Sequence, residues 1–139
     1  MIVWGGHEDI EFLETGARFN VAANAWTPTT LSNVPAHRMG HCAVWTGSEM
    51  IVWGGQASPD RLARDGARYN PAADEWKPMP ELEGPAARHF QRDDGAVWTG
   101  KGMLIFGGGT GREEFDSTYL WTPSSTAKAG QEESSNGKF

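Results

Sequence analysis

Two long segments of the chain repeat one another, and this repetition constrains the fold more than any other feature. Residues 35–55 and 85–108 share the phrase Ala-Val-Trp-Thr-Gly, followed by a second apolar run that ends in Gly-Gly. That second run begins at Met1, at Met50 and at Met103, with intervals of 49 and 53 residues. A period of this length indicates a repeat protein, in which each unit buries its apolar face against its neighbours.

A second phrase has the same period. Residues 16–26 (Gly-Ala-Arg-Phe-Asn-Val-Ala-Ala-Asn-Ala-Trp) return as residues 66–76 (Gly-Ala-Arg-Tyr-Asn-Pro-Ala-Ala-Asp-Glu-Trp), an interval of 50 residues. The interval of 53 residues is longer because residues 91–95 replace a shorter stretch near Gly40. We interpret this difference as an insertion in one loop, because the other landmarks keep the period.

Composition excludes several classes of fold and partner. The chain has 139 residues, with 18 Gly, 8 Pro and 7 Trp, and its apolar runs are short. We therefore expect an all-β fold without long helices. A net charge of −6 argues against nucleic acid. The single cysteine, Cys42, excludes an internal disulfide and offers no metal-ligand spacing. No apolar stretch is long enough to span a membrane, and no compartment is indicated, so we expect a soluble chain.

Each repeat predicts four short strands. In the second repeat these are residues 41–45 and 50–53, joined by a turn at residues 46–49, followed by residues 67–70 and 76–79. The first two runs are apolar throughout, which is typical of strands covered on both faces. Pro78 restricts the last strand to a sheet edge. Four antiparallel strands in about 50 residues predict one blade of a β-propeller.

The residues that follow these strands resemble kelch repeats. A double glycine closes the second strand, and an aromatic residue and a tryptophan follow at a fixed spacing. The matching residues are Gly5, Gly6, Phe19 and Trp26 in the first repeat, Gly54, Gly55, Tyr69 and Trp76 in the second, and Gly107 and Gly108 in the third. The resemblance implies an all-β protein of antiparallel four-stranded blades, an incomplete kelch-type β-propeller with about ten strands.

We predict four segments along the chain. Residues 1–34 form strands two to four of a first blade, residues 35–84 a complete blade, residues 85–123 strands one to three of a third blade, and residues 124–139 a disordered polar tail. Three blades do not close a propeller. Two explanations stay open: the chain is a fragment of a longer propeller, or copies associate through exposed blade edges. A third possibility is a truncation that does not fold stably.

The resemblance implies that the loops between strands two and three of each blade emerge on one face. These loops differ between repeats, whereas the strands do not, and loops on a rigid scaffold are where recognition usually occurs. The alternative is that their charges only serve solubility. The candidate binding residues are Glu8, Asp9, Glu11, Asp60, Arg61, Arg64, Arg112, Glu113 and Glu114.

Residues that recur at equivalent positions are predicted to build the scaffold. Four arginines recur in this way, and we expect them to stack on tryptophans or pair with carboxylates. We likewise expect four tryptophans to lie in the core rather than to form a platform for carbohydrate. The arginines are Arg18, Arg38, Arg68 and Arg88, and the tryptophans are Trp45, Trp53, Trp76 and Trp98.

We expect no catalytic residue, no metal site and no cofactor. Some kelch propellers are copper oxidases that use histidines, tyrosines and a cysteine-linked tyrosine. Here Tyr69 occupies a packing position and Cys42 lies in an apolar strand, which argues against such a site. The remaining residues of these types are His7, His37, His41, His89 and Tyr119. Asp93 and Asp94 are adjacent and lack the alternating spacing of a calcium loop.

The sequence hypothesis is a binding module. It would recognise a protein or a small polar ligand through the loops on one face, with no nucleic-acid or membrane partner and with self-association through blade edges as a further possibility. The alternative is a fragment of a propeller enzyme, sugar-processing or galactose-oxidase-like, whose catalytic residues lie partly in missing blades. Propellers host unrelated functions, so the fold alone does not decide between the two.

Overall fold

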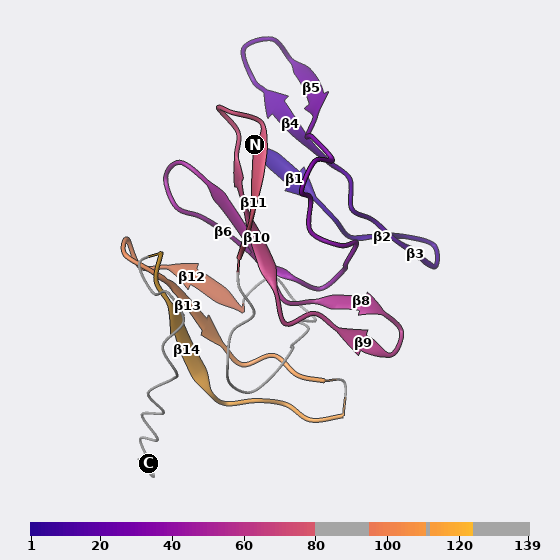
Figure 1. Cartoon of the computed structure of the whole chain (residues 1–139), viewed down its shortest axis with the longest axis vertical. Helices are drawn as coiled ribbons and strands as arrows, with labels where there is room; N and C mark the ends of the chain where they lie inside the picture. The colour runs from indigo at the N-terminus through magenta and orange to yellow at the C-terminus, as the bar shows by residue number, and fades with distance from the viewer. Residues whose placement is uncertain (80–94, 111, 124–139) are drawn as a thin grey trace.

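The described residues form three antiparallel sheets that follow one another like blades (Figure 1), together with two smaller two-stranded sheets. The computed structural model describes residues 1–79, 95–110 and 112–123. Three sheets of three, four and three strands contain the ten blade strands, which confirms the all-β, kelch-like prediction. The predicted tail at residues 124–139 lies outside the described residues. Among the described residues, no helix has the length and apolar character needed to cross a membrane.

The second sheet is a complete blade. It consists of β6 (Cys42–Trp45), β7 (Met50–Trp53), β10 (Gly66–Asn70) and β11 (Glu75–Met79), in the order β11-β10-β7-β6. β11, which contains Pro78, lies at the sheet edge as predicted. The first sheet has the order β1-β4-β5, and the third has β12-β13-β14. Their strands are β1 (Ile2–Trp4), β4 (Gly16–Asn20) and β5 (Ala25–Pro28), then β12 (Ala96–Trp98), β13 (Met103–Phe106) and β14 (Thr118–Trp121).

The register of the strands repeats with the sequence. Phe19 pairs with Trp26 across β4 and β5, as Tyr69 pairs with Trp76 across β10 and β11. The two pairs have nearly the same geometry, with ring centroids 5.0 and 4.9 Å apart. In the third blade, Trp121 lies opposite Met103, just as Tyr69 lies opposite Met50. The repeated phrases therefore specify the pairing of strands as well as their order.

The core lies on the two faces of the second blade. One face packs against the third blade through a cluster that contains Cys42, Ile51, Trp53, Met103, Ile105 and Trp121. The other packs against the first blade through Trp4, Met50, Val52, Ala67, Tyr69 and Trp76. All four residues of β7 are buried, as the uniformly apolar run predicts. Each blade is thus stabilised by its neighbours, which is the expected behaviour of a repeat protein.

The prediction that Trp45 lies in the core is wrong. Trp53 and Trp76 are buried and Trp98 is partly buried, but 51% of Trp45 is exposed. β6 buries alternate residues, with Cys42 and Val44 toward the third blade. Trp45 lies on the opposite face of this strand, and no strand of the described chain covers it there.

Asp74 joins the first two blades. Its Oδ1 accepts hydrogen bonds from the Tyr69 hydroxyl at 2.5 Å and from the Thr30 backbone N–H at 3.1 Å. Arg18 of β4 lies 3.8 Å from Asp74 Oδ2 and donates to the carbonyl oxygen of Pro71 at 2.7 Å. The expected pairing of Arg18 and Arg68 with carboxylates is confirmed, since Arg68 lies 3.4 Å from Glu49.

Replacing Asp74 with asparagine should lower stability at neutral pH but not in acid. Hydrogen bonds from Tyr69 and Thr30, together with Arg18, lower the pKa of Asp74, so its stabilising effect is present above the unfolded pKa and lost as pH falls through the folded pKa. Because Asp74 is partly exposed, we expect a loss of about 1 kcal/mol at pH 7. Asparagine tolerates the positive φ of 52° at this position.

This expectation is checked by urea unfolding of the wild type and of Asp74→Asn at pH 7 and at about pH 3, because the carboxyl of the unfolded chain titrates at about pH 4. The neighbouring Glu75→Gln is the matched control, because Glu75 forms an exposed ion pair with Lys77 and no comparable loss is expected. An equal deficit of Asp74→Asn at both pH values would contradict the role assigned to the carboxylate.

Candidate binding face

Three loops that differ in sequence rise from identical bases. The second glycine of each Gly-Gly pair accepts a hydrogen bond through its carbonyl oxygen from the end of the loop: Gly6 from Leu13, Gly55 from Ala63 and Gly108 from Phe115, all at 2.8–2.9 Å. The backbone N–H of the first glycine of each pair donates to a carbonyl oxygen at the end of the same loop. The acceptors are Thr15 for Gly5, Asp65 for Gly54 and Ser117 for Gly107. In Figure 1 the three loops extend toward the same side of the molecule. We call residues 7–15, 56–65 and 109–116 the loop face, of which residue 111 is not described.

The double glycines are required at these bases by conformation, and Gly55 is required by space as well. Gly54 and Gly55 have φ of 70° and 90°, and the φ angles of the other two pairs are also positive. A Cβ on Gly55 would lie 2.7 Å from the carbonyl oxygen of Met39 and 2.8 Å from the backbone nitrogen of His41. Backbone approaches the glycine from the preceding interblade segment, so the loop base is also a contact between successive parts of the chain.

Two of the three loops are small hairpins, which their polar sequences did not predict. β2 (His7–Glu8) pairs with β3 (Glu11–Phe12), and β8 (Gln56–Ser58) pairs with β9 (Arg61–Leu62). In the third loop, Gly109 and Glu114 form a single bridge. The loop face is therefore hydrogen-bonded backbone, which can present its side chains at fixed positions.

Arg38 holds the first two loops together. Its carbonyl oxygen accepts from Gly6 N at 2.8 Å, and its N–H donates to the carbonyl oxygen of Leu13 at 3.2 Å. Its guanidinium donates to the carbonyl oxygens of Gly54 and Asp65 and, at 2.9 Å, to the Asp65 carboxylate. The next residue, Met39, exchanges two hydrogen bonds with Gln56. The fully buried Arg38 thus joins a loop of one blade to a loop of the next.

This role of Arg38 was only partly visible in the sequence. Its recurrence as Arg88 correctly indicated a scaffold residue, but nothing in the spacing identified Asp65 and two carbonyl oxygens as its partners. Arg38 precedes the first strand of the second blade, because β6 starts at Cys42. Arg88 lies outside the described residues.

The nine predicted binding residues are all exposed on the loop face. None of these side chains forms an ion pair with another described residue. Glu8 and Glu11 lie directly opposite each other across β2 and β3, where like charges repel, and Asp9 begins the turn with a φ of 51°. Each of the three loops carries three of the nine residues. They are Glu8, Asp9 and Glu11 in the first loop, Asp60, Arg61 and Arg64 in the second, and Arg112, Glu113 and Glu114 in the third.

Sequence reasoning missed the apolar residue at the tip of the first loop. Ile10 is 93% exposed, and acidic residues stand on both sides of it at Asp9 and Glu11. A β-branched apolar residue in a polar, two-residue turn was the available signal. Beside this hairpin, the rings of Phe12 and His37 lie 6.5 Å apart. The first loop therefore combines negative charge with an exposed apolar side chain.

The residues of the types that a copper-oxidase site would use do not gather into one site among the described residues. Cys42 is buried, donates to the carbonyl oxygen of Trp53 at 3.4 Å and has its pKa raised by burial to about 12, which disfavours the thiolate. Desolvation and the hydrogen bond to Asp74 raise the pKa of Tyr69. His41 lies edge-on to Trp4, with ring centroids 5.3 Å apart. Within the described ranges, no three His, Cys, Asp or Glu side chains are grouped to hold a metal ion. His89, Asp93 and Asp94 lie outside these ranges.

Comparison with known proteins supports the repeat interpretation. Residues 1–135 match a family model described as the KLHDC2/KLHL20/DRC7 Kelch-repeats domain. One solved structure, described as "Structure of YjhT", shares the fold with a TM-score of 0.56 and 16% sequence identity. The match covers 70% of this chain and 27% of that one. No curated protein matches the sequence.

Proposed function

Since the chain belongs to the family of kelch-repeat domains, we propose that it binds a protein partner through the loop face. Kelch domains generally mediate protein interactions, and the chain is a propeller-type interaction module in this general sense. The observation that carries the proposal is the contrast between loops and scaffold. Identical hydrogen bonds close the base of every loop, while nine exposed charged residues that differ between repeats occupy the loops themselves.

The first loop suggests the chemistry of the partner surface. Residues 8–14 contain four acidic side chains and no lysine or arginine. The exposed Ile10 stands at the tip of this loop, between Asp9 and Glu11. A partner surface with an apolar contact surrounded by basic side chains complements this arrangement, since charges at the rim of an interface set the association rate and the choice of partner.

Reversing one charge on the first loop tests the proposal. Glu11→Lys places a lysine opposite Glu8, an arrangement that favours the hairpin, so the variant should fold. Glu75→Lys is the matched control, because Glu75 is exposed and begins β11 at the turn that leads from β10, at the opposite end of β10 from the loop face. Proteins that bind the immobilised wild type are identified, and their binding to each variant is measured.

We expect at least one partner whose affinity falls about tenfold with Glu11→Lys and stays within about twofold with Glu75→Lys. The loss should be smaller at high salt, because exposed charges are screened there. If both variants bind every captured protein as the wild type does, the loop face is not the binding surface.

Two parts of the sequence hypothesis stay predictions. A small polar ligand is the alternative occupant of the loop face, and the propeller enzyme is the alternative function. Self-association through blade edges is a further prediction, and light scattering of the purified chain across a range of concentrations measures it directly.

A further inference from the structure

The first and second loops share one short piece of backbone, residues 38 and 39. Arg38 is bonded to the first loop, since its carbonyl oxygen accepts from Gly6 and its N–H donates to Leu13. Met39 is bonded to the second loop through two hydrogen bonds with Gln56. A displacement of either loop base therefore has to move this segment or break its hydrogen bonds.

The same segment is packed closely against a glycine of each loop base. A Cβ on Gly5 would lie 3.0 Å from the carbonyl oxygen of Arg38, and a Cβ on Gly55 would lie 2.7 Å from that of Met39. The backbone of each glycine thus leaves no room for a methyl group beside the segment. Atoms packed in this way transmit a displacement to their neighbours.

The side chain of Arg38 adds a contact whose acidic partner does not recur. Its guanidinium donates to the carbonyl oxygens of Gly54 and Asp65, at 3.0 and 3.1 Å, and to the Asp65 carboxylate at 2.9 Å. Thr15 and Ser117 have the place of Asp65 in the first and third loops, since each accepts from the first glycine of its own loop. Neither residue has a carboxylate, so this charged pair is specific to the junction of the first two loops.

The charged pair can be reached from one side only. The side chain of Arg38 is 1% exposed, whereas that of Asp65 is 45% exposed. Asp65 is therefore the place where a change at the surface of the second loop reaches the buried segment.

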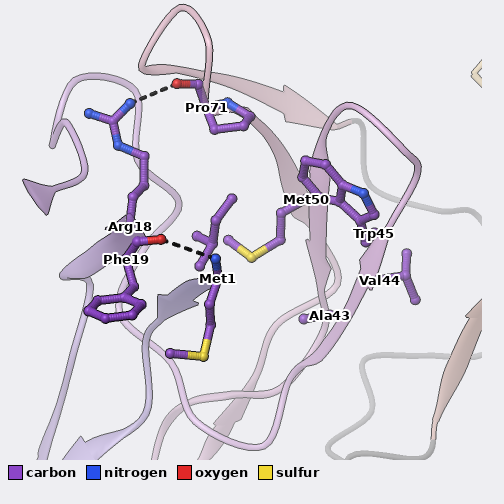
Figure 2. A pocket seen from close by; sticks show the side chains of 9 residues that line it. Met1, Arg18, Phe19, Ala43, Val44, Trp45, Met50 and Pro71 are labelled. Carbon is purple, nitrogen blue, oxygen red and sulfur yellow. Dashed lines mark hydrogen bonds between the residues drawn. The ribbon is translucent and has the colours of Figure 1, made fainter. Parts of the chain in front are cut away.

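Another contact between the first two blades lies away from the loops. Arg18 donates to the carbonyl oxygen of Pro71 at 2.7 Å (Figure 2). Pro71 follows the end of β10 that is opposite to the loop face, and Gly47, in the turn between β6 and β7, lies at that end of its blade as well. The two ends of the junction can therefore be tested separately.

We propose that the first and second loops open and close as one cooperative unit, coupled through Arg38 and Asp65. Local openings of a protein break contiguous groups of hydrogen bonds together. Coupling between two sites is reciprocal, so a molecule that orders either loop also orders the other. The coupling is a property of the chain without a partner, so it goes beyond the proposed function and does not depend on it. The amides that open together are those of Gly6 and Leu13 in the first loop and of Gly54 and Ala63 in the second.

Strain placed at the base of the first loop tests the coupling. Gly6 and Gly47 have φ of 101° and 105°, and a Cβ on either would meet open space. Gly6→Ala and its matched control Gly47→Ala therefore introduce similar backbone strain without a clash, at opposite ends of the blades. Amide hydrogen exchange of the chain alone, followed by NMR, measures the opening at each residue.

We expect Gly6→Ala to speed exchange about tenfold at Leu13 and at least about threefold at Gly54 and Ala63. With Gly47→Ala these three amides should change by less than about twofold. The amides of β7, which is paired on both sides, report global unfolding. Faster exchange at Leu13 without a change at Gly54 and Ala63 would overturn the proposal. An equal rise in Gly47→Ala, or at β7, would overturn it too.

Substitution of Asp65 tests the opposite direction, and it decides the question if Gly6→Ala does not fold. Asp65→Asn keeps the backbone carbonyl and the size of the side chain but removes the charge that Arg38 binds. Asp60→Asn is the matched control, because Asp60 is exposed in the same loop and forms no ion pair with another described residue.

Exchange at Gly6 and Leu13 in the first loop should rise at least about threefold with Asp65→Asn and less than about twofold with Asp60→Asn. If both variants leave these two amides as they are in the wild type, the loops open independently and the coupling is disproved.

Discussion

Replacing Arg38 with alanine is expected to lower the free energy of unfolding by about 2–4 kcal/mol, because a fully buried guanidinium and its hydrogen bonds are lost, although its partner Asp65 is partly exposed. The side chain is fully buried and donates to the carbonyl oxygens of Gly54 and Asp65 and to the Asp65 carboxylate. Alanine leaves these acceptors without their donor, and unpaired buried polar groups are costly. Urea denaturation followed by tryptophan fluorescence measures the change.

Arg68→Ala is the matched control for this substitution. Arg68 also pairs with a carboxylate, Glu49 at 3.4 Å, but both side chains are partly exposed. We expect a loss of about 1 kcal/mol or less, as for other exposed ion pairs. Similar losses for the two variants would contradict the role of Arg38 as a buried clasp between the loops.

Replacing Trp76 with alanine is expected to cost about 3–5 kcal/mol, as for other large buried aromatic residues. Trp76 is 1% exposed and lies between Tyr69 and Trp4, with ring centroids 4.9 and 5.4 Å away. Its removal opens a cavity on the face of the second blade that packs against the first. Thermal or urea unfolding measures the loss.

Trp26→Ala is an internal control, because Trp26 has the same position in the first repeat. It makes the same contact with its partner Phe19, at 5.0 Å, but is 49% exposed. We expect a loss of about 1–2 kcal/mol, in proportion to the smaller apolar area buried. An equal loss for the two tryptophans would mean that the repeat motif stabilises each blade separately, against the packing between blades described above.

The sequence predicted the strands and their pairing because both are local properties of the repeat. Apolar runs, turn residues and the double glycine recur together, and the register between Tyr69 and Trp76 follows from their spacing. The exposure of a side chain, in contrast, depends on which other strands cover it. Trp45 is a large aromatic residue of the kind found in cores, but no strand of the described residues covers its face of β6.

The sequence predicted which loops carry the nine candidate residues but not how these loops are built, and the binding role of the residues stays a prediction. Variable charged residues between repeated strands indicated the loop face, and the nine residues are exposed there. The short hairpins were missed because their polar residues carry no alternating pattern. The partners of Arg38 were missed because its contacts with Gly54 and Asp65 depend on backbone carbonyl oxygens, which no side-chain pattern reveals.

Amide hydrogen exchange of the chain, with and without a captured protein partner, tests the central claim most directly. The claim is that repeated residues build the scaffold and that the loop face binds. We predict that the partner slows exchange at residues 7–12, 56–62 and 112–116 and leaves the hairpin turns at residues 21–24, 46–49 and 71–74 unchanged. Protection of these turns with no change in the three loops would contradict the claim.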